Sequence, residues 1–137
     1  MQYNPFSLKD KVVLITGASS GIGRQCAISC SLMGAIVVLF GRDTERLNET
    51  LRLMKFPEKH IINQVDLVEY KKVEEDVKGI VIKHGKINGL INCAGISTTL
   101  PLNAVSPQKM EQFFQTNVIG AINLTRQVTK STFFSET

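Results

Sequence analysis

Three glycines and two serines lie close together where they could bind an anion. The segment from Thr16 to Gly23 reads Thr-Gly-Ala-Ser-Ser-Gly-Ile-Gly. The first turn of a helix has backbone N–H groups without partners inside the helix, and the helix dipole favours negative charge there. Because glycine has no side chain, a diphosphate can approach such a backbone closely. The segment predicts a phosphate-binding turn, and the alternative is that a tight strand-to-helix connection simply requires glycine.

The residues on either side of this turn have the patterns of a strand and a helix. Val12 to Ile15 form an apolar run, and Ile22, Cys26, Cys30 and Met33 follow the turn at helical spacing. A strand that leads through a glycine-rich turn into a helix is typical of dinucleotide-binding folds. We therefore expect a helix whose apolar stripe contains these four side chains.

Apolar runs and breaks at glycine or proline divide the remaining chain into alternating strands and helices. We expect strands at 36–40, 61–65 and 87–92, and helices that begin after Asp43, after Asp66 and at Ser106-Pro107. Uninterrupted apolar strands are typical of parallel sheets that helices cover on both faces. The alternation predicts an α/β fold with right-handed crossovers, formed by residues 1–137 as a single domain.

Arg42 follows the second predicted strand, about twenty residues after the glycine turn. Folds that prefer NAD place a carboxylate near this position to accept from the ribose 2′-hydroxyl, whereas an arginine suits a 2′-phosphate. Gly41 stands just before Arg42, and a guanidinium can bind phosphate through two parallel hydrogen bonds. The pattern favours NADP over NAD, the alternative being that Arg42 is a solvated loop residue. Asp43 is expected to cap the next helix.

The glycine segment closely resembles the nucleotide-binding turn of the short-chain dehydrogenase/reductase family. Residues 92–95, Asn-Cys-Ala-Gly, are similar to the family's Asn-Asn-Ala-Gly segment, with Cys93 in place of the second asparagine. Residues 116–120, Thr-Asn-Val-Ile-Gly, match the family's helix motif, whose asparagine binds a water in the proton relay. The resemblance implies a Rossmann-like, three-layer fold with about four strands in the order 3-2-1-4. It also implies hydride transfer between NAD(P) and a carbonyl or alcohol, and the oxoacyl-carrier-protein reductases are the most similar members.

The resemblance also implies roles for single residues. Asn117, expected within the apolar stripe of the last helix, would be the one catalytic position retained, and a core asparagine with satisfied hydrogen bonds is the alternative. Asp66 would bind the adenine amino group, or serve as a helix cap together with Glu69. The stripe itself comprises Met110, Phe113, Phe114, Asn117, Ala121, Leu124 and Val128. The residues expected to bind the cofactor are Gly17, Ser19, Ser20, Gly21, Ile22, Gly23, Arg42, Asp66, Leu67, Asn92, Ala94 and Gly95.

The family's proton-transferring pair is absent from the sequence. In that pair a lysine four residues after a tyrosine lowers the tyrosine pKa. The tyrosines here are Tyr3 and Tyr70, and the residues four positions later are Ser7 and Glu74. We therefore expect a chain that is truncated before the further strands of the family's fold. Such a chain would have one unpaired edge strand and would show no turnover alone. A small carbonyl or alcohol substrate would need the missing half. A non-enzymatic dinucleotide sensor or regulatory module, and a truncated product without function, are the alternatives.

Composition argues against several other functions. The net charge is +4, but the lysines and arginines are scattered, whereas nucleic-acid binders concentrate them on one face. No signal peptide or membrane span is apparent, so we expect a cytoplasmic protein without nucleic-acid or membrane partners. Cys26, Cys30 and Cys93 are expected to be buried reduced thiols rather than metal ligands or disulfide partners. The resemblance implies in addition that the last helix can pack against a second subunit.

Overall fold

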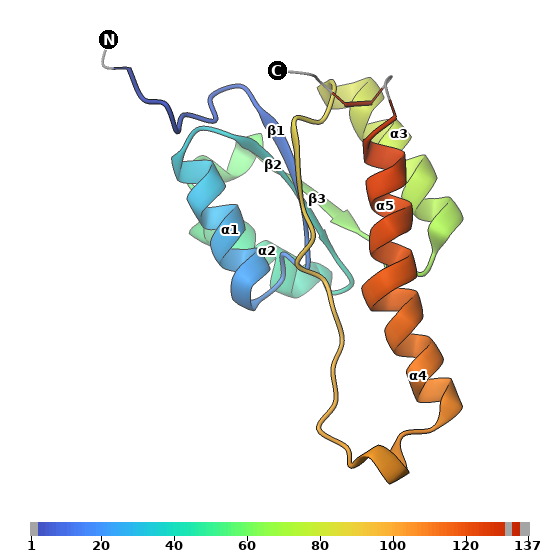
Figure 1. Ribbon diagram of the computed structural model, residues 1–137. Helices are drawn as coiled ribbons and strands as arrows, with labels where there is room; N and C mark the ends of the chain where they lie inside the picture. Colours follow the sequence, from blue (N-terminus) through green and yellow to red (C-terminus); the bar gives the residue numbers. More distant parts are fainter. Residues whose placement is uncertain (1–2, 131–132, 135–137) are drawn as a thin grey trace.

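A four-stranded parallel sheet lies at the centre of the protein (Figure 1). The computed structural model describes residues 3–130 and 133–134. The strand order is β3-β2-β1-β4, which confirms the predicted order and the Rossmann-like fold, with β3 at one edge. The strands are β1 (Val12–Thr16), β2 (Ile36–Gly41), β3 (Ile61–Gln64) and β4 (Gly89–Ile91).

Helices cover both faces of this sheet, as the apolar strands indicated (Figure 1). One face packs against α1 (Gly21–Leu32) and α2 (Thr44–Leu53), and the other against α3 (Tyr70–His84) and α5 (Ala121–Val128). Among the described residues, no helix is long and apolar enough to cross a membrane. The other elements are the short 3₁₀ helices η1 (Pro57–Lys59) and η2 (Leu102–Ala104), the helix α4 (Pro107–Phe114) and the π-helical segment η3 (Gln115–Gly120).

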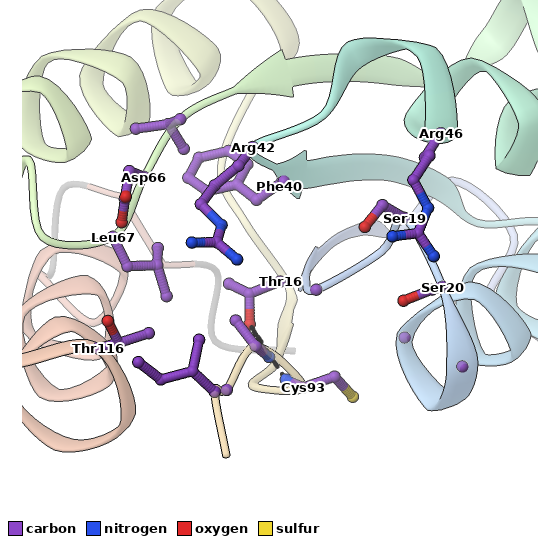
Figure 2. A pocket seen from close by; sticks show the side chains of 18 of the residues that line it. Thr16, Ser19, Ser20, Phe40, Arg42, Arg46, Asp66, Leu67, Cys93 and Thr116 are labelled. Carbon is purple, nitrogen blue, oxygen red and sulfur yellow. Dashed lines mark hydrogen bonds between the residues drawn. The ribbon is translucent and has the colours of Figure 1, made fainter. Parts of the chain in front are cut away.

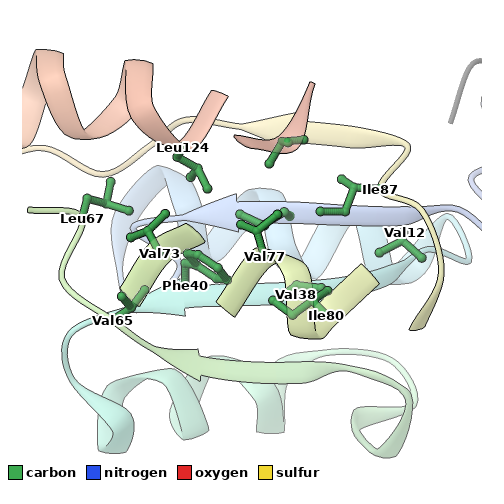
Figure 3. Close-up of a cluster of buried hydrophobic side chains, with 12 residues drawn as sticks. Val12, Val38, Phe40, Val65, Leu67, Val73, Val77, Ile80, Ile87 and Leu124 are labelled. Atoms are coloured by element: carbon green, nitrogen blue, oxygen red, sulfur yellow. The ribbon is translucent and has the colours of Figure 1, made fainter. Parts of the chain in front are cut away.

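Alternate residues of the central strands contribute to two separate cores, because successive side chains of a strand point to opposite faces. Leu14 of β1 packs with the residues beneath α3 and α5, and its neighbour Ile15 packs beneath α1 and α2. Figure 3 shows the first of these cores, in which Phe40 of β2 lies against Val73 and Val77 of α3. The strands are parallel, so their carboxyl ends lie on the same side of the sheet.

The expected apolar stripe of α1 is wrong in part. Ile22 and Met33 are 77% and 45% exposed. Cys30 is buried as predicted, but Gly23 and Ala27 are buried in place of Ile22 and Cys26. Gly23 packs directly against the preceding turn, which brings its side of the helix toward the sheet.

The last helical region differs more from its prediction, which was one helix with a continuous buried stripe. The region is interrupted by η3, and Met110, Phe114 and Asn117 are exposed. Figure 1 shows that α4 extends past the end of the sheet, and Met110 and Phe114 on this helix stay exposed among the described residues. Burial begins at Gly120 and continues with Leu124, where α5 lies over the sheet. Packing of this region against a second subunit stays a prediction.

Most predicted boundaries and caps are confirmed within a few residues. Gly34 ends α1 with a φ of 94°, and the carboxylate of Asp43 accepts from the backbone N–H of Arg46 at the start of α2. The strand β4 is shorter than expected and is an outer strand of the described sheet. The expected unpaired edge is nevertheless not bare, because Ile87, just before β4, forms a single parallel bridge with Phe134.

Candidate functional site: the turn between β1 and α1

Each glycine of the turn between β1 and α1 is required for its own reason. A Cβ on Gly17 would meet the backbone nitrogen of Ala94 at 2.8 Å, and a Cβ on Gly23 would collide with the carbonyl oxygen of Gly17. Gly17 and Gly21 both have a positive φ, of 62° and 54°, but a Cβ on Gly21 would meet nothing within 4 Å. Gly17 and Gly23 therefore serve close packing, whereas the backbone at Gly21 faces open space.

The start of α1 has the properties of an anion site. Ser20, the N-cap residue, has an extended backbone and makes no side-chain capping bond, and the first turn carries no acidic residue. The backbone N–H groups of this turn therefore lack the carboxylate or hydroxyl that usually satisfies them. A dinucleotide diphosphate fits this position, because it would supply the missing acceptors and the helix dipole favours its charge.

The turn opens onto a cavity of about 340 Å³ at the carboxyl ends of the strands (Figure 2). This volume lies in the range of about 300–1,000 Å³ that is typical of small-molecule sites. Eleven of the twelve residues predicted to bind the cofactor line this cavity, and Asn92 is the exception. These eleven are Gly17, Ser19, Ser20, Gly21, Ile22, Gly23, Arg42, Asp66, Leu67, Ala94 and Gly95.

Two arginines, not one, lie at the β2 side of the cavity. Arg42 and Arg46 both line it, and Figure 2 shows the side chain of Arg46 beside Ser19. The same two arginines and Ser19 also line an adjoining hollow. The carboxylates of Asp43 and Glu45 border this hollow as well, but that of Asp43 is engaged by the N–H of Arg46 at 3.1 Å. The pair of guanidinium groups suits a phosphate better than a ribose hydroxyl.

Asp66 follows β3 and lines the opposite side of the cavity. The hydrogen bonds of the predicted capping box with Glu69 are present, although α3 begins only at Tyr70 and Glu69 is its N-cap residue. Within the loop, one Asp66 oxygen accepts from the N–H of Val68, and the side chain of Glu69 accepts from the N–H of Asp66. The carboxylate of Asp66 is thus fixed by local bonds and borders the cavity.

Thr16 is a site residue whose hydrogen bonds the sequence did not reveal. Its hydroxyl oxygen accepts from the backbone N–H groups of Cys93 and Ala94, at 3.1 and 3.0 Å. Thr16 is 1% exposed, so these bonds join the ends of β1 and β4 within the protein interior. The signal available in the sequence was a hydroxyl side chain at the end of an otherwise apolar strand, immediately before the first glycine. The other lining residues outside the prediction are Phe40, Gly41, Arg46, Val65, Cys93, Ile96 and Thr116.

The two predicted asparagines lie beside the cavity rather than in its lining. Asn92 donates to the hydroxyl of Thr125 on α5 at 3.2 Å. Asn117 is exposed, not buried as expected, and its side-chain amide forms two 2.8 Å hydrogen bonds with the backbone of Ile96. Asn117 therefore ties η3 to the loop that follows β4, and its role in a proton relay stays a prediction.

The three cysteines are free thiols, but only Cys30 is buried as expected. Burial raises the pKa of the Cys30 thiol above its ordinary value. The pKa of Cys93, which lines the cavity, is also raised, first by desolvation and then by the neighbouring Cys26. Both thiols are therefore protonated at neutral pH. Among the described residues, no cluster of three or more His, Cys, Asp or Glu side chains could hold a metal ion.

Comparison with known proteins agrees with this geometry. The sequence profile of the short chain dehydrogenases matches residues 11–135. The chain belongs to the short-chain dehydrogenase family. It is 32% identical over 133 residues to the 3-ketodihydrosphingosine reductase of Bos taurus, covering 90% of this chain and 39% of that protein. It is 31% identical over 127 residues to the L-xylulose reductase of Caenorhabditis elegans, covering 92% of this chain and 49% of that protein.

Solved structures of short-chain dehydrogenases have the same fold. The citronellol catabolism dehydrogenase of Pseudomonas aeruginosa aligns with a TM-score of 0.79 at 31% identity, over 92% of this chain and 52% of that one. A short chain dehydrogenase from Bacillus anthracis aligns with a TM-score of 0.84 at 30% identity, over 89% of this chain and 50% of that one. The chain thus spans about half the length, or less, of the relatives that it matches. A closer likeness to oxoacyl-carrier-protein reductases stays a prediction.

Proposed function

We propose that this chain is the NADP(H)-binding part of a short-chain oxidoreductase that acts on a carbonyl or alcohol. Members of the family use nicotinamide dinucleotides. The observation that carries the proposal is the cavity itself, in which an uncapped helix N-terminus and two guanidinium groups line one continuous wall. A single phosphate-bearing ligand with charges at both places, such as NADP, matches this wall.

Each residue of the wall has a separate task in this proposal. The backbone N–H groups from Ser20 to Gly23 bind the diphosphate, because they lack other acceptors and lie at the positive end of the helix dipole. Arg42 and Arg46 bind the 2′-phosphate, and Asp66 accepts from the adenine amino group. When bound, the cofactor supplies or accepts the hydride.

Asn117 contributes on the nicotinamide side of the cavity. Its two bonds to Ile96 hold the loop after β4, and Ile96 and Thr116 both line the cavity. This position within a π-helical segment supports a functional role, because such interruptions of α-helices are frequent at functional sites. We further propose that the 137 residues alone do not turn over substrate, because they contain no Tyr-x-x-x-Lys pair to transfer the proton.

The test is a pair of calorimetric titrations of the 137-residue chain, one with NADPH and one with NADH, at the same salt concentration. Hydrogen bonds to charged groups contribute about 1.5–3 kcal/mol, so NADPH should bind at least about tenfold more tightly. Equal affinities, or tighter binding of NADH, would contradict the assignment of NADP. Steady oxidation of NADPH by the purified chain would contradict the proposed lack of turnover.

The lack of a Tyr-x-x-x-Lys pair favours a second candidate function, a non-enzymatic dinucleotide sensor. The two candidate functions differ in the effect of NADPH binding on association of the chain with other macromolecules. A sensor predicts that NADPH binding changes the association of the chain with another macromolecule, which analytical ultracentrifugation with and without NADPH would detect for self-association. A cofactor-binding part of an enzyme predicts no such dependence.

A further inference from the structure

Arg24 of α1 lines neither the cavity nor the adjoining hollow, yet it is bonded to two residues that line both, Ser19 and Arg46. Its Nη2 donates to the carbonyl oxygen of Ser19 at 2.6 Å and to that of Arg46 at 3.4 Å. Its Nε donates to the hydroxyl oxygen of Thr50 on α2 at 3.0 Å. A third contact of Nη2 is the carboxylate of Glu49 at 3.1 Å. One side chain thus joins the glycine turn to α2.

Thr50 extends this connection to a second peptide of the turn. It is fully buried, and its hydroxyl donates to the carbonyl oxygen of Ala18 at 2.8 Å while it accepts from Arg24. The carbonyl groups of Ala18 and Ser19 are therefore both held on the side of the turn that faces α2. We call Arg24 and Thr50, with these two carbonyl groups, the turn clamp.

The turn clamp also fixes the opposite side of the turn. In a trans peptide the C=O and the following N–H point in opposite directions, and the described chain has no cis peptide bond. Holding the carbonyls of Ala18 and Ser19 toward α2 therefore directs the N–H groups of Ser19 and Ser20 away from it. Both serines line the cavity, so these donors are oriented before any anion arrives.

The same clamp sets the spacing between Ser19 and the two arginines. Ser19, Arg42 and Arg46 line the hollow beside the cavity, and the bond from Arg24 to the Arg46 carbonyl holds the first turn of α2 against this wall. The ion pair with Glu49 adds little, because its carboxylate is 46% exposed and exposed pairs contribute little free energy. The bonds to the two carbonyls and to Thr50 are the ones that position the wall.

We propose that Arg24 is a positioning residue that, together with Thr50, sets the preference of this site for a nucleotide with a 2′-phosphate. The proposal rests on the proposed function, since it concerns the same cavity. Arg24 touches no part of the ligand in this account. It acts by holding Ser19 and Arg46 at a fixed separation, so that the 2′-phosphate meets both residues without rearrangement of the turn.

The experiment compares Kd values for NADPH and NADH across five forms of the 137-residue chain: wild type, Arg24→Met, Arg24→Lys, Thr50→Val and Arg52→Met. Arg52 is an exposed arginine on α2, so its substitution removes the same charge without touching the clamp. Arg24→Met and Thr50→Val should weaken NADPH binding at least about tenfold and NADH binding far less. The preference, defined as the Kd for NADH divided by the Kd for NADPH, should therefore fall; this is the ratio compared below. Arg52→Met should leave the ratio unchanged.

Arg24→Lys and one further variant, Thr50→Ser, separate geometry from charge and from folding. Arg24→Lys keeps the charge but loses the planar fork, so its ratio should fall as in Arg24→Met; a ratio equal to that of the wild type would overturn the proposal. Thr50→Ser keeps the hydroxyl and should keep the wild-type ratio. That result would show that the hydrogen bonds of the hydroxyl, and not the packing of the side chain, set the preference. A general loss of stability would weaken both nucleotides equally and leave the ratio intact, and that result would also overturn the proposal.

A measurement without ligand completes the test. Amide hydrogen exchange at Ser19 and Ser20 should be faster in Arg24→Met than in Arg52→Met, because the carbonyls of the turn are released; equal rates would contradict the clamp. If the wild-type chain bound neither nucleotide, the proposed function would fail, and the role in specificity with it. If the wild type preferred NADPH and Arg24→Met kept the same ratio, the clamp alone would fail.

Discussion

Replacing Gly21 by alanine should separate cofactor binding from stability. Gly21 has a φ of 54°, where an alanine is strained, and a Cβ there would meet nothing within 4 Å. The left-handed conformation costs about 1–2 kcal/mol for a residue with a side chain, which lowers the melting temperature by about 3–8 °C in a chain of this size. The added methyl group would occupy the space where a diphosphate must approach the helix N-terminus.

The loss of affinity should therefore exceed what strain alone would cause. Displacing the diphosphate from one charge-assisted hydrogen bond costs about 1.5–3 kcal/mol, which weakens NADPH binding at least about tenfold. Thermal unfolding followed by circular dichroism gives the stability, and a fluorescence titration with NADPH gives the affinity. Both measurements use the same preparation of the 137-residue chain.

Gly85→Ala is the matched control for this substitution. Gly85 ends α3 with a φ of 90°, and a Cβ there would also meet nothing within 4 Å. This variant should lose at least as much stability as Gly21→Ala but bind NADPH like the wild type, because Gly85 does not line the cavity. Equal NADPH affinities of the two variants would refute the placement of the diphosphate at the start of α1.

Two further predictions concern the loop after β4. Thr16→Val should lower the free energy of unfolding by about 2 kcal/mol in a urea titration, because the N–H groups of Cys93 and Ala94 lose their acceptor. Thr16→Ser keeps the hydroxyl and should stay close to the wild type. Equal losses in the two variants would contradict the hydrogen bonds to the hydroxyl. Alkylation of Cys93 by iodoacetamide should be slow at pH 7 and reach half of its limiting rate only above pH 9.0, because the thiol pKa is raised and only the thiolate reacts. Saturating NADPH should protect this thiol from alkylation. An alkylation rate with its inflection at or below pH 9.0, or no protection by NADPH, would contradict the partly desolvated position of Cys93 in the cavity lining.

Local sequence patterns predicted the alternation of strands and helices, because the apolar runs of β1 and β2 are buried on both faces and the glycine and Asx signals lie at real turns. The strand order, in contrast, came from the resemblance to the short-chain dehydrogenase/reductase family. The glycine turn was also predictable, because the spacing of its glycines is visible in the sequence and the contact of Gly23 with Gly17 is local. These features depend on residues that are close in the sequence or on rules that apply to all parallel sheets.

Features that depend on distant partners were not predictable from the sequence. The role of Thr16 requires backbone groups that are 77 and 78 residues further along the chain. The exposure of Phe114 and Asn117 depends on where the sheet ends, which helical spacing does not reveal. Arg46 lies in the first turn of α2, and that it lines the cavity beside Ser19 depends on how α2 packs beside the glycine turn.

The most direct test of the central claim is an NMR titration of the ¹⁵N-labelled chain with NADPH. If the free N–H groups at the start of α1 bind the diphosphate, the amide signals of Ser20, Gly21, Ile22 and Gly23 should shift most, and those near Gly85 should not move. Binding that leaves these four amides unchanged, or no change anywhere in the spectrum at millimolar NADPH, would contradict the account.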